Sequence, residues 1–137
     1  MTTGDFTSAT GQAWWAAAAT KGNRIELQPL SVLRRRGALS STLRHEYTHA
    51  VIDALSGGKA PRWLAEGLAI RVAGEGPNFA RFRTRERLST EVIEQRLALI
   101  TSAEEMRYLY GEAYRQVGNL IQLNGETSVW RRLAQKE

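Results

Sequence analysis

The chain has 137 residues, a formal net charge of +5 and a pI near 10.1, and 42% of its residues are hydrophobic. This length suits one domain with its own core and is short for two. The sequence contains no cysteine, which excludes a disulfide framework, a thiolate zinc site and a thiol nucleophile. No run of residues approaches the roughly 18 apolar residues of a membrane-spanning helix. We therefore expect a single globular domain that spans residues 1–137.

The excess positive charge is concentrated in two arginine-rich segments, residues 34–36 and 81–87. Such segments can bind nucleic acid, a membrane surface or a cell-wall polymer. Apart from Phe79 and Phe82, they lack the interleaved aromatic residues on which nucleic-acid bases stack. We interpret them as a solvated basic face, and nucleic-acid binding is the weakest functional hypothesis.

A β-hairpin is predicted first along the chain. Residues 24–28 alternate between polar and apolar, a glycine–asparagine turn signal precedes them, and Pro29 ends the strand. A strand so close to a turn usually has a hairpin partner, so we assign residues 13–20 to that partner despite their helix-favouring alanines. The expected fold class is therefore α+β, with a short antiparallel sheet or hairpin over about residues 13–28 packed on an active-site helix.

That active-site helix is expected at about residues 39–56, where Ser40 or Ser41 can cap it and a glycine pair can end it. The apolar stripe that should face the core consists of Leu43, Tyr47, Ala50, Val51 and Ala54. Further helices are expected at about residues 62–74, 90–99, 103–124 and 126–135. The pair Ser102 and Glu105 forms a capping box at the start of the longest helix.

The most informative segment reads His45-Glu46-Tyr47-Thr48-His49 and contains both histidines of the chain. Residues four apart share one face of a helix, so the two imidazoles can bind one Zn²⁺ ion. Glu46 lies about 100° further around the helix, where it can reach a metal-bound water as a general base. The alternative is an exposed helix with two unremarkable histidines, but this motif on a helix is specific for a metal site.

Zinc requires a third protein ligand, and the chain has no third histidine. Glu66 lies within the apolar segment 63–70, where a lone carboxylate would be costly to bury. The chain between His49 and Glu66 is long enough to reverse and bring two helices side by side. We therefore expect Glu66 to be the third ligand, and the alternative is a salt bridge with Arg62 or simple exposure. Weaker ligand candidates are Asp53 and Glu75.

These motifs resemble a known family. The helix from His45 to Asp53 is similar to that of thermolysin-like gluzincins, and residues 61–69, which read P-x-W-L-x-E-G-x-A, resemble the peptidase-MA-like bacterial branch. The resemblance implies a small zincin-like zinc metalloendopeptidase with His45, His49 and Glu66 on Zn²⁺ and Glu46 as general base. Its substrate would be a peptide or protein. The metzincin pattern does not fit, because Ile52 and Leu55 occupy the positions of its glycine and third histidine.

The sequence departs from thermolysin at Ile70, where that enzyme type has an aspartate four residues after its ligand glutamate. A partner for the ligand histidines must then come from elsewhere, and Asp53 is a candidate. Residues 113–116 resemble the family's A-Y-x-Q segment, so Tyr114 is a candidate donor to the oxyanion of the tetrahedral intermediate. Tyr110, one turn earlier, is the alternative donor, and a simple packing role is equally compatible with either tyrosine.

A second functional hypothesis is a zinc-binding module without turnover, either a self-blocked proenzyme or a domain that presents substrate or cell-wall polymer. Modules of the family often belong to larger exported bacterial proteins, which implies an extracytoplasmic location. Residues 1–5 nevertheless lack the features of a signal peptide. The sequence predicts neither the substrate, nor the cleavage preference, nor the oligomeric state.

Overall fold

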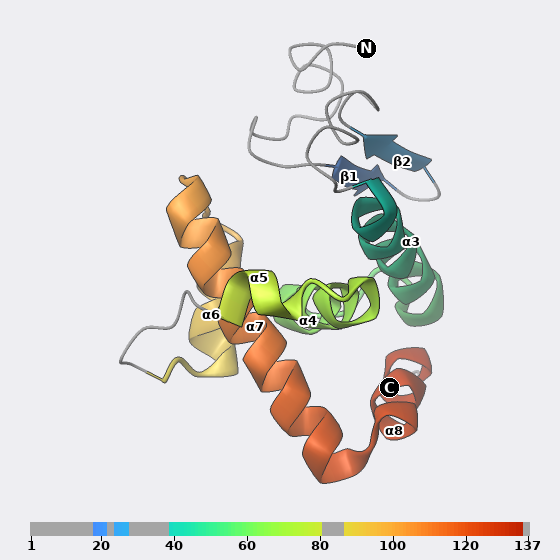
Figure 1. The fold of residues 1–137 in the computed structure, drawn as a ribbon. Helices are drawn as coiled ribbons and strands as arrows, with labels where there is room; N and C mark the ends of the chain where they lie inside the picture. Colours follow the sequence, from blue (N-terminus) through green and yellow to red (C-terminus); the bar gives the residue numbers. More distant parts are fainter. Residues whose placement is uncertain (1–17, 22–23, 28–38, 81–86, 136–137) are drawn as a thin grey trace.

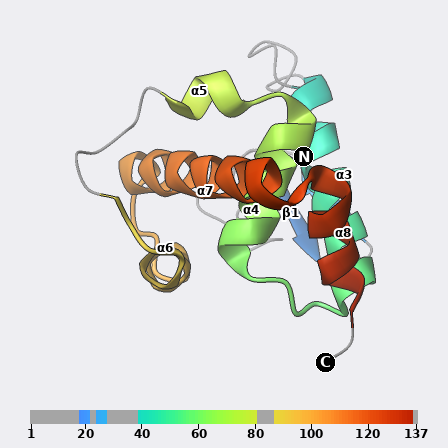
Figure 2. The ribbon, with the colours of Figure 1, turned by 90° about the horizontal axis from the view of Figure 1, so that it is seen from below.

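The computed structural model describes residues 18–21, 24–27, 39–80 and 87–135 (Figure 1). Its helices are α3 (Leu39–Ser56), α4 (Arg62–Ala73), α5 (Gly76–Ala80), α6 (Thr90–Leu97), α7 (Ala103–Asn124) and α8 (Glu126–Ala134). Helix α4 lies at the centre and packs against α3 on one side and α7 on the other. Figure 2 shows α8 beside α3 and α6 beneath α7. The fold thus places α4 between the predicted active-site helix and the longest helix.

The expected α+β class is wrong, because the fold is all-helical. The only strands among the described residues are β1 (Ala18–Lys21) and β2 (Arg24–Leu27), which pair antiparallel with Ala18 opposite Leu27. Two strands of four residues are too small to form a layer of the core, and no strand occurs in the described chain from Leu39 onward. Residues 13–17 and 28, which the predicted hairpin includes, lie outside the described residues.

The buried apolar side chains form two clusters, both built from helices. The first joins α3, α4, α7 and α8 through Ile52, Leu68, Val117, Val129 and Leu133. The second joins α6 and α7 through Ile93, Leu97, Leu109 and Ala113. Trp63, at the start of α4, packs against both clusters. Helix α7 contributes to both, so it fixes the position of α4 relative to α6 and α8.

The predicted orientation of α3 is wrong. Leu43 and Tyr47, which belong to the expected core stripe, are 42% and 66% exposed. The buried side chains of this helix are Thr42, Glu46, Thr48 and Ile52. The side of α3 that carries His45 and His49 lies opposite the apolar stripe, and α3 packs on α4 through this histidine side. The side of α3 that carries the predicted ligands is therefore the side that is buried.

The helix bounds agree with the predictions to within two residues, apart from the unpredicted α5. The serine half of the capping box is confirmed, because the Ser102 hydroxyl accepts a hydrogen bond from the Glu105 amide at 3.1 Å. Helix α4 begins after Pro61, whose side chain offers no cap. Its first amides, those of Arg62 and Trp63, instead each donate to the Glu94 carboxylate of α6 at 3.0 Å. A carboxylate at a helix N-terminus stabilises that end of the helix.

Candidate metal centre

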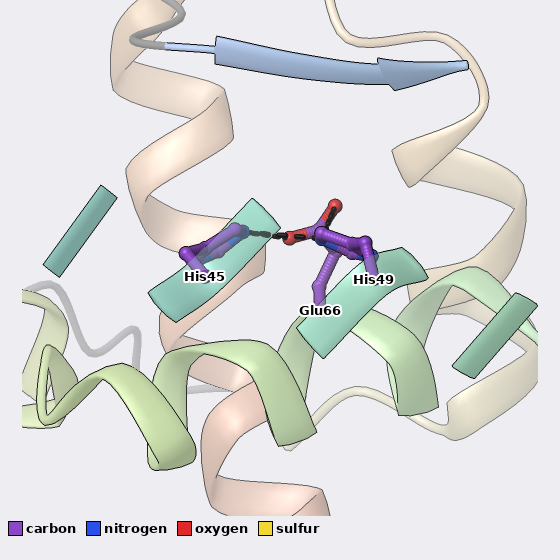
Figure 3. A group of neighbouring side chains, drawn as sticks. All are labelled: His45, His49 and Glu66. Atoms are coloured by element: carbon purple, nitrogen blue, oxygen red, sulfur yellow. Dashed lines mark hydrogen bonds and ion pairs between the residues drawn. The ribbon is translucent and has the colours of Figure 1, made fainter. Parts of the chain in front are cut away.

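Three side chains from two helices converge on one point, as Figure 3 shows. His45 and His49 lie on successive turns of α3, and Glu66 extends towards them from α4. The two Nε2 atoms are 3.1 Å apart. One Glu66 oxygen lies 3.1 Å from Nε2 of His45, and the other lies 3.2 Å from Nε2 of His49. The structure thus brings together the three ligands that the sequence predicts.

The spacing of these donor atoms fits a tetrahedral zinc ion. Donors about 2.0–2.1 Å from such an ion lie roughly 3.3 Å from one another. The observed separations of 3.1–3.2 Å are close to that value, and the two histidines contact different oxygens of Glu66. The side chains of His45, His49 and Glu66 are 13%, 17% and 19% exposed, so the site is mostly buried and still reachable from solvent. Two imidazoles and one carboxylate are also the ligand set of many catalytic zinc sites.

The other ring nitrogen of His45 shows how that imidazole is oriented. Its Nδ1 atom lies 2.7 Å from the Glu75 carboxylate. A carboxylate can only accept there, so Nδ1 carries the hydrogen. In the neutral ring Nε2 then has a free lone pair, which points at a second carboxylate, that of Glu66, and at the other imidazole. Lone pairs that face one another are satisfied by a hydrogen atom on one of the nitrogens or by a metal ion between them.

Electrostatics favours positive charge at the same point. Burial alone would lower the pKa of His45, but hydrogen bonds and charge from Glu66 and Glu75 outweigh it and raise this pKa to about 10. Burial also acts to lower the pKa of His49, and the charge of Glu66 again raises it. The pKa of Glu66 is lowered, because the two histidines outweigh the effect of its own burial. Glu66 therefore stays ionised and attracts a cation to the ligand set.

Glu46, the predicted general base, is buried on α3 with 7% exposure. Its negative charge contributes to the raised pKa values of His49 and Tyr110, so its carboxylate lies near both. The helix geometry turns Glu46 away from the line of the two histidines, and it is not part of the group of three ligands. This is the position expected for a base beside a metal rather than for a ligand.

The two candidate oxyanion donors, Tyr110 and Tyr114, both lie on α7. Burial, followed by the negative charges of Glu66 and Glu46, raises the pKa of the half-buried Tyr110 well above the usual 10, so its hydroxyl lies near these carboxylates. Tyr114 packs one turn further along α7, where its ring and hydroxyl lie against the backbone of Gly76. The assignment of Tyr114 as the oxyanion donor stays a prediction, with Tyr110 as the alternative.

Asp53, the sequence candidate for orienting a ligand histidine, is not the partner of His45. It lies exposed on α3, and the described partner of His45 Nδ1 is Glu75, which the sequence favoured less. The thermolysin position four residues after Glu66 is Ile70, which is fully buried in the apolar interior. A carboxylate there would have no place, so the orienting role passes to Glu75.

Glu75 reaches His45 because α4 ends two residues earlier. Gly74 has φ 72°, a left-handed conformation that glycine adopts without strain, and its amide bonds to the Arg71 carbonyl at 3.2 Å. If the helix continued, Glu75 would lie nine residues after Glu66, on the opposite face. The reversal at Gly74 brings both carboxylates to the same histidine. The Gly74-Glu75-Gly76 triplet was the available signal, since a glycine commonly follows the end of a helix.

In the part of the chain that the structure describes, no helix is long and apolar enough to span a membrane. A scan against protein-family models, a search of curated proteins and a search of solved structures each find no match to this chain.

Proposed function

We propose that the protein is a zinc-dependent metallopeptidase of the gluzincin type, similar to the peptidase-MA-like family, with a peptide or protein as substrate. One observation carries this proposal. The Nε2 atoms of His45 and His49 lie 3.1 Å apart, each lies within 3.2 Å of a Glu66 oxygen, and Glu75 accepts from Nδ1 of His45, which supports a metal ion at this point.

Zinc held by these three side chains would polarise the scissile carbonyl and make a water molecule acidic at neutral pH. Glu46 would accept the proton of that water on a carboxylate oxygen and pass it to the leaving amine. The burial of Glu46 removes competing solvent, which strengthens its electrostatic influence on the reacting atoms. His49, one turn after His45, completes the ligand face of α3 on the side next to Glu46.

The remaining polar groups orient the ligands. Glu75 holds His45 through Nδ1 and fixes the tautomer with the free Nε2. Tyr110 lies near Glu66, because the charge of this carboxylate, after burial, raises the pKa of the tyrosine. Such partners are typical of catalytic zinc sites, where they set ligand basicity and orientation.

The test compares the wild type with Glu46→Gln, which keeps the size of the side chain but cannot take up a proton. We expect one zinc per chain in both proteins by elemental analysis. Hydrolysis of a mixed peptide library, read by mass spectrometry, should fall by roughly 10²–10⁴ in the variant. A chelator should abolish wild-type cleavage, and added zinc should restore it.

Two results would contradict the proposal in different ways. A wild-type protein that binds zinc but cleaves no peptide, alone or after limited proteolysis, would favour the non-catalytic zinc module. A protein that binds no zinc at micromolar concentrations would show that His45, His49 and Glu66 form only a buried ion-pair network.

A further inference from the structure

Helix α5 begins directly after Glu75, the residue whose carboxylate lies 2.7 Å from Nδ1 of His45. The main chain of Glu75 is bonded on both sides, because its amide donates to the Ile70 carbonyl at 3.0 Å and its carbonyl accepts from the Asn78 amide at 2.9 Å. The backbone of Glu75 therefore follows any movement of α5 relative to α4. A helix of five residues is too short to hold its place without packing on the rest of the fold.

Helix α5 packs on α7, and two glycines bring these helices close together (Figure 2). Gly76 is buried, and a β-carbon there would overlap the Tyr114 ring and lie 2.8 Å from its Cε1 atom. From the other side, a β-carbon on Gly111 of α7 would lie 2.9 Å from the Phe79 carbonyl oxygen of α5. Carbon atoms in contact normally lie about 3.5–4.0 Å apart, so a β-carbon on Gly76 would require a shift of roughly 1 Å.

We propose that Gly76 is a positioning residue for the metal centre. Its close contact with Tyr114 holds α5 on α7, and this packing keeps the Glu75 carboxylate on His45. The inference rests on the proposed zinc site and deepens it, since it names what keeps the His45 ring turned towards the other ligands. A shift of roughly 1 Å at Gly76 would lengthen the bond between Glu75 and His45 to a separation at which no hydrogen bond remains.

The test is Gly76→Ala, and the matched control is Gly118→Ala on α7, where a β-carbon would meet no described atom within 4 Å. The first measurement is NMR of the isotope-labelled histidine rings in the metal-free protein. The bond to Glu75 should protect the Nδ1 proton of His45 from exchange with solvent, and Gly76→Ala should lose this signal. The second is zinc affinity by competition with a chelating dye, which should fall 10- to 100-fold, the usual loss for such a partner. The control should change neither.

A second substitution reaches the same contact from α7 and leaves the residues next to Glu75 unchanged. Gly111→Ala should lower zinc affinity by roughly tenfold, because its β-carbon would push against the Phe79 carbonyl and move α5 away from α7. This variant takes the place of Gly76→Ala if that protein does not fold.

A Glu75→Ala background separates an effect through Glu75 from a general loss of structure. There, Gly76→Ala should cause no further loss of zinc affinity, because the group that it positions is absent. Equal losses with and without Glu75 would overturn the inference, and so would a folded Gly76→Ala protein with wild-type zinc affinity. Failure of the wild type to bind zinc would instead reject the proposed function, and the Nδ1 signal of His45 would still show whether Gly76 positions Glu75.

Discussion

The two sides of helix α3 differ in the opposite sense from an ordinary amphipathic helix. One side carries His45, Glu46 and His49 and is turned into the protein, against α4. The other side carries Leu43 and Tyr47, which are 42% and 66% exposed. In most helices of globular proteins the apolar side is buried and the polar side is solvated. Here the polar side is buried because its groups satisfy one another.

This difference shows how a functional site changes the usual packing rule. Burying unpaired polar groups is costly, but each ligand on α3 meets a described partner, either Glu66 or Glu75. Ile52, on the same side, is fully buried and joins the main core cluster. The buried side of α3 thus has two parts, the polar residues of the candidate metal centre and the apolar Ile52 of the core.

The largest expected difference between the two sides concerns metal binding. His49→Ala should lose stoichiometric zinc, since two protein ligands no longer meet the requirement of a catalytic zinc site. Tyr47→Ala, on the exposed side, should keep one zinc per chain. Elemental analysis after dialysis measures both. If the two variants retained equal zinc, the buried side of α3 would not be the metal side.

The next difference concerns stability and tests the apolar part of the buried side. Ile52→Ala should lower the free energy of unfolding of the metal-free protein by roughly 2–5 kcal/mol, because it leaves a cavity in the main cluster. Leu43→Ala should change it by no more than about 0.5 kcal/mol, because that side chain is exposed and belongs to neither buried cluster. Urea unfolding followed by circular dichroism gives both values. Equal losses would mean that Leu43 is buried in solution.

A smaller effect is expected where the buried side of α3 meets the end of α4. Glu75→Gln keeps the shape of the side chain but removes its charge, which weakens the orientation of His45, and should lower zinc affinity by roughly 10- to 100-fold. Asp53→Asn, on the exposed part of α3, is the matched control and should have no measurable effect. A stronger effect of Asp53→Asn would restore the sequence-based assignment.

Much of the site was predictable because it depends on local spacing. The four-residue interval between His45 and His49 fixes their common face on any helix, and Glu66 was identified by its position in an apolar segment. The bounds of α3 and α7 follow from capping residues and periodicity in the same way. These features need no knowledge of how helices pack on one another.

The errors all concern contacts between elements. Choosing between Tyr110 and Tyr114 requires the register of α7 on α4, where Gly67 lies close to Ala113 and Val117. Choosing Glu75 requires the reversal at Gly74. The predicted α+β class is wrong because an alternating stretch predicts strands without showing whether they form a layer of the core. The predicted orientation of α3 is wrong because a helix can also be buried through a polar side whose groups bind one another.

The last prediction compares the ligand side of α3 with itself at different pH values. In the metal-free protein the pKa of His45 is raised from 6.5 to about 10. Protonation of His45 therefore stabilises the fold fully below about pH 6.5, and this contribution is lost as the pH rises through 10.

Zinc must displace that proton, so apparent zinc affinity should rise about tenfold per pH unit for each proton released. Glu66 contributes no proton, because its pKa is lowered. Dye competition between pH 6 and 8 measures the slope, and calorimetry in buffers of different ionisation enthalpy counts the protons. A flat profile would mean that the histidines face the site as neutral rings, and that Glu66 and Glu75 do not draw positive charge to this side of the helix.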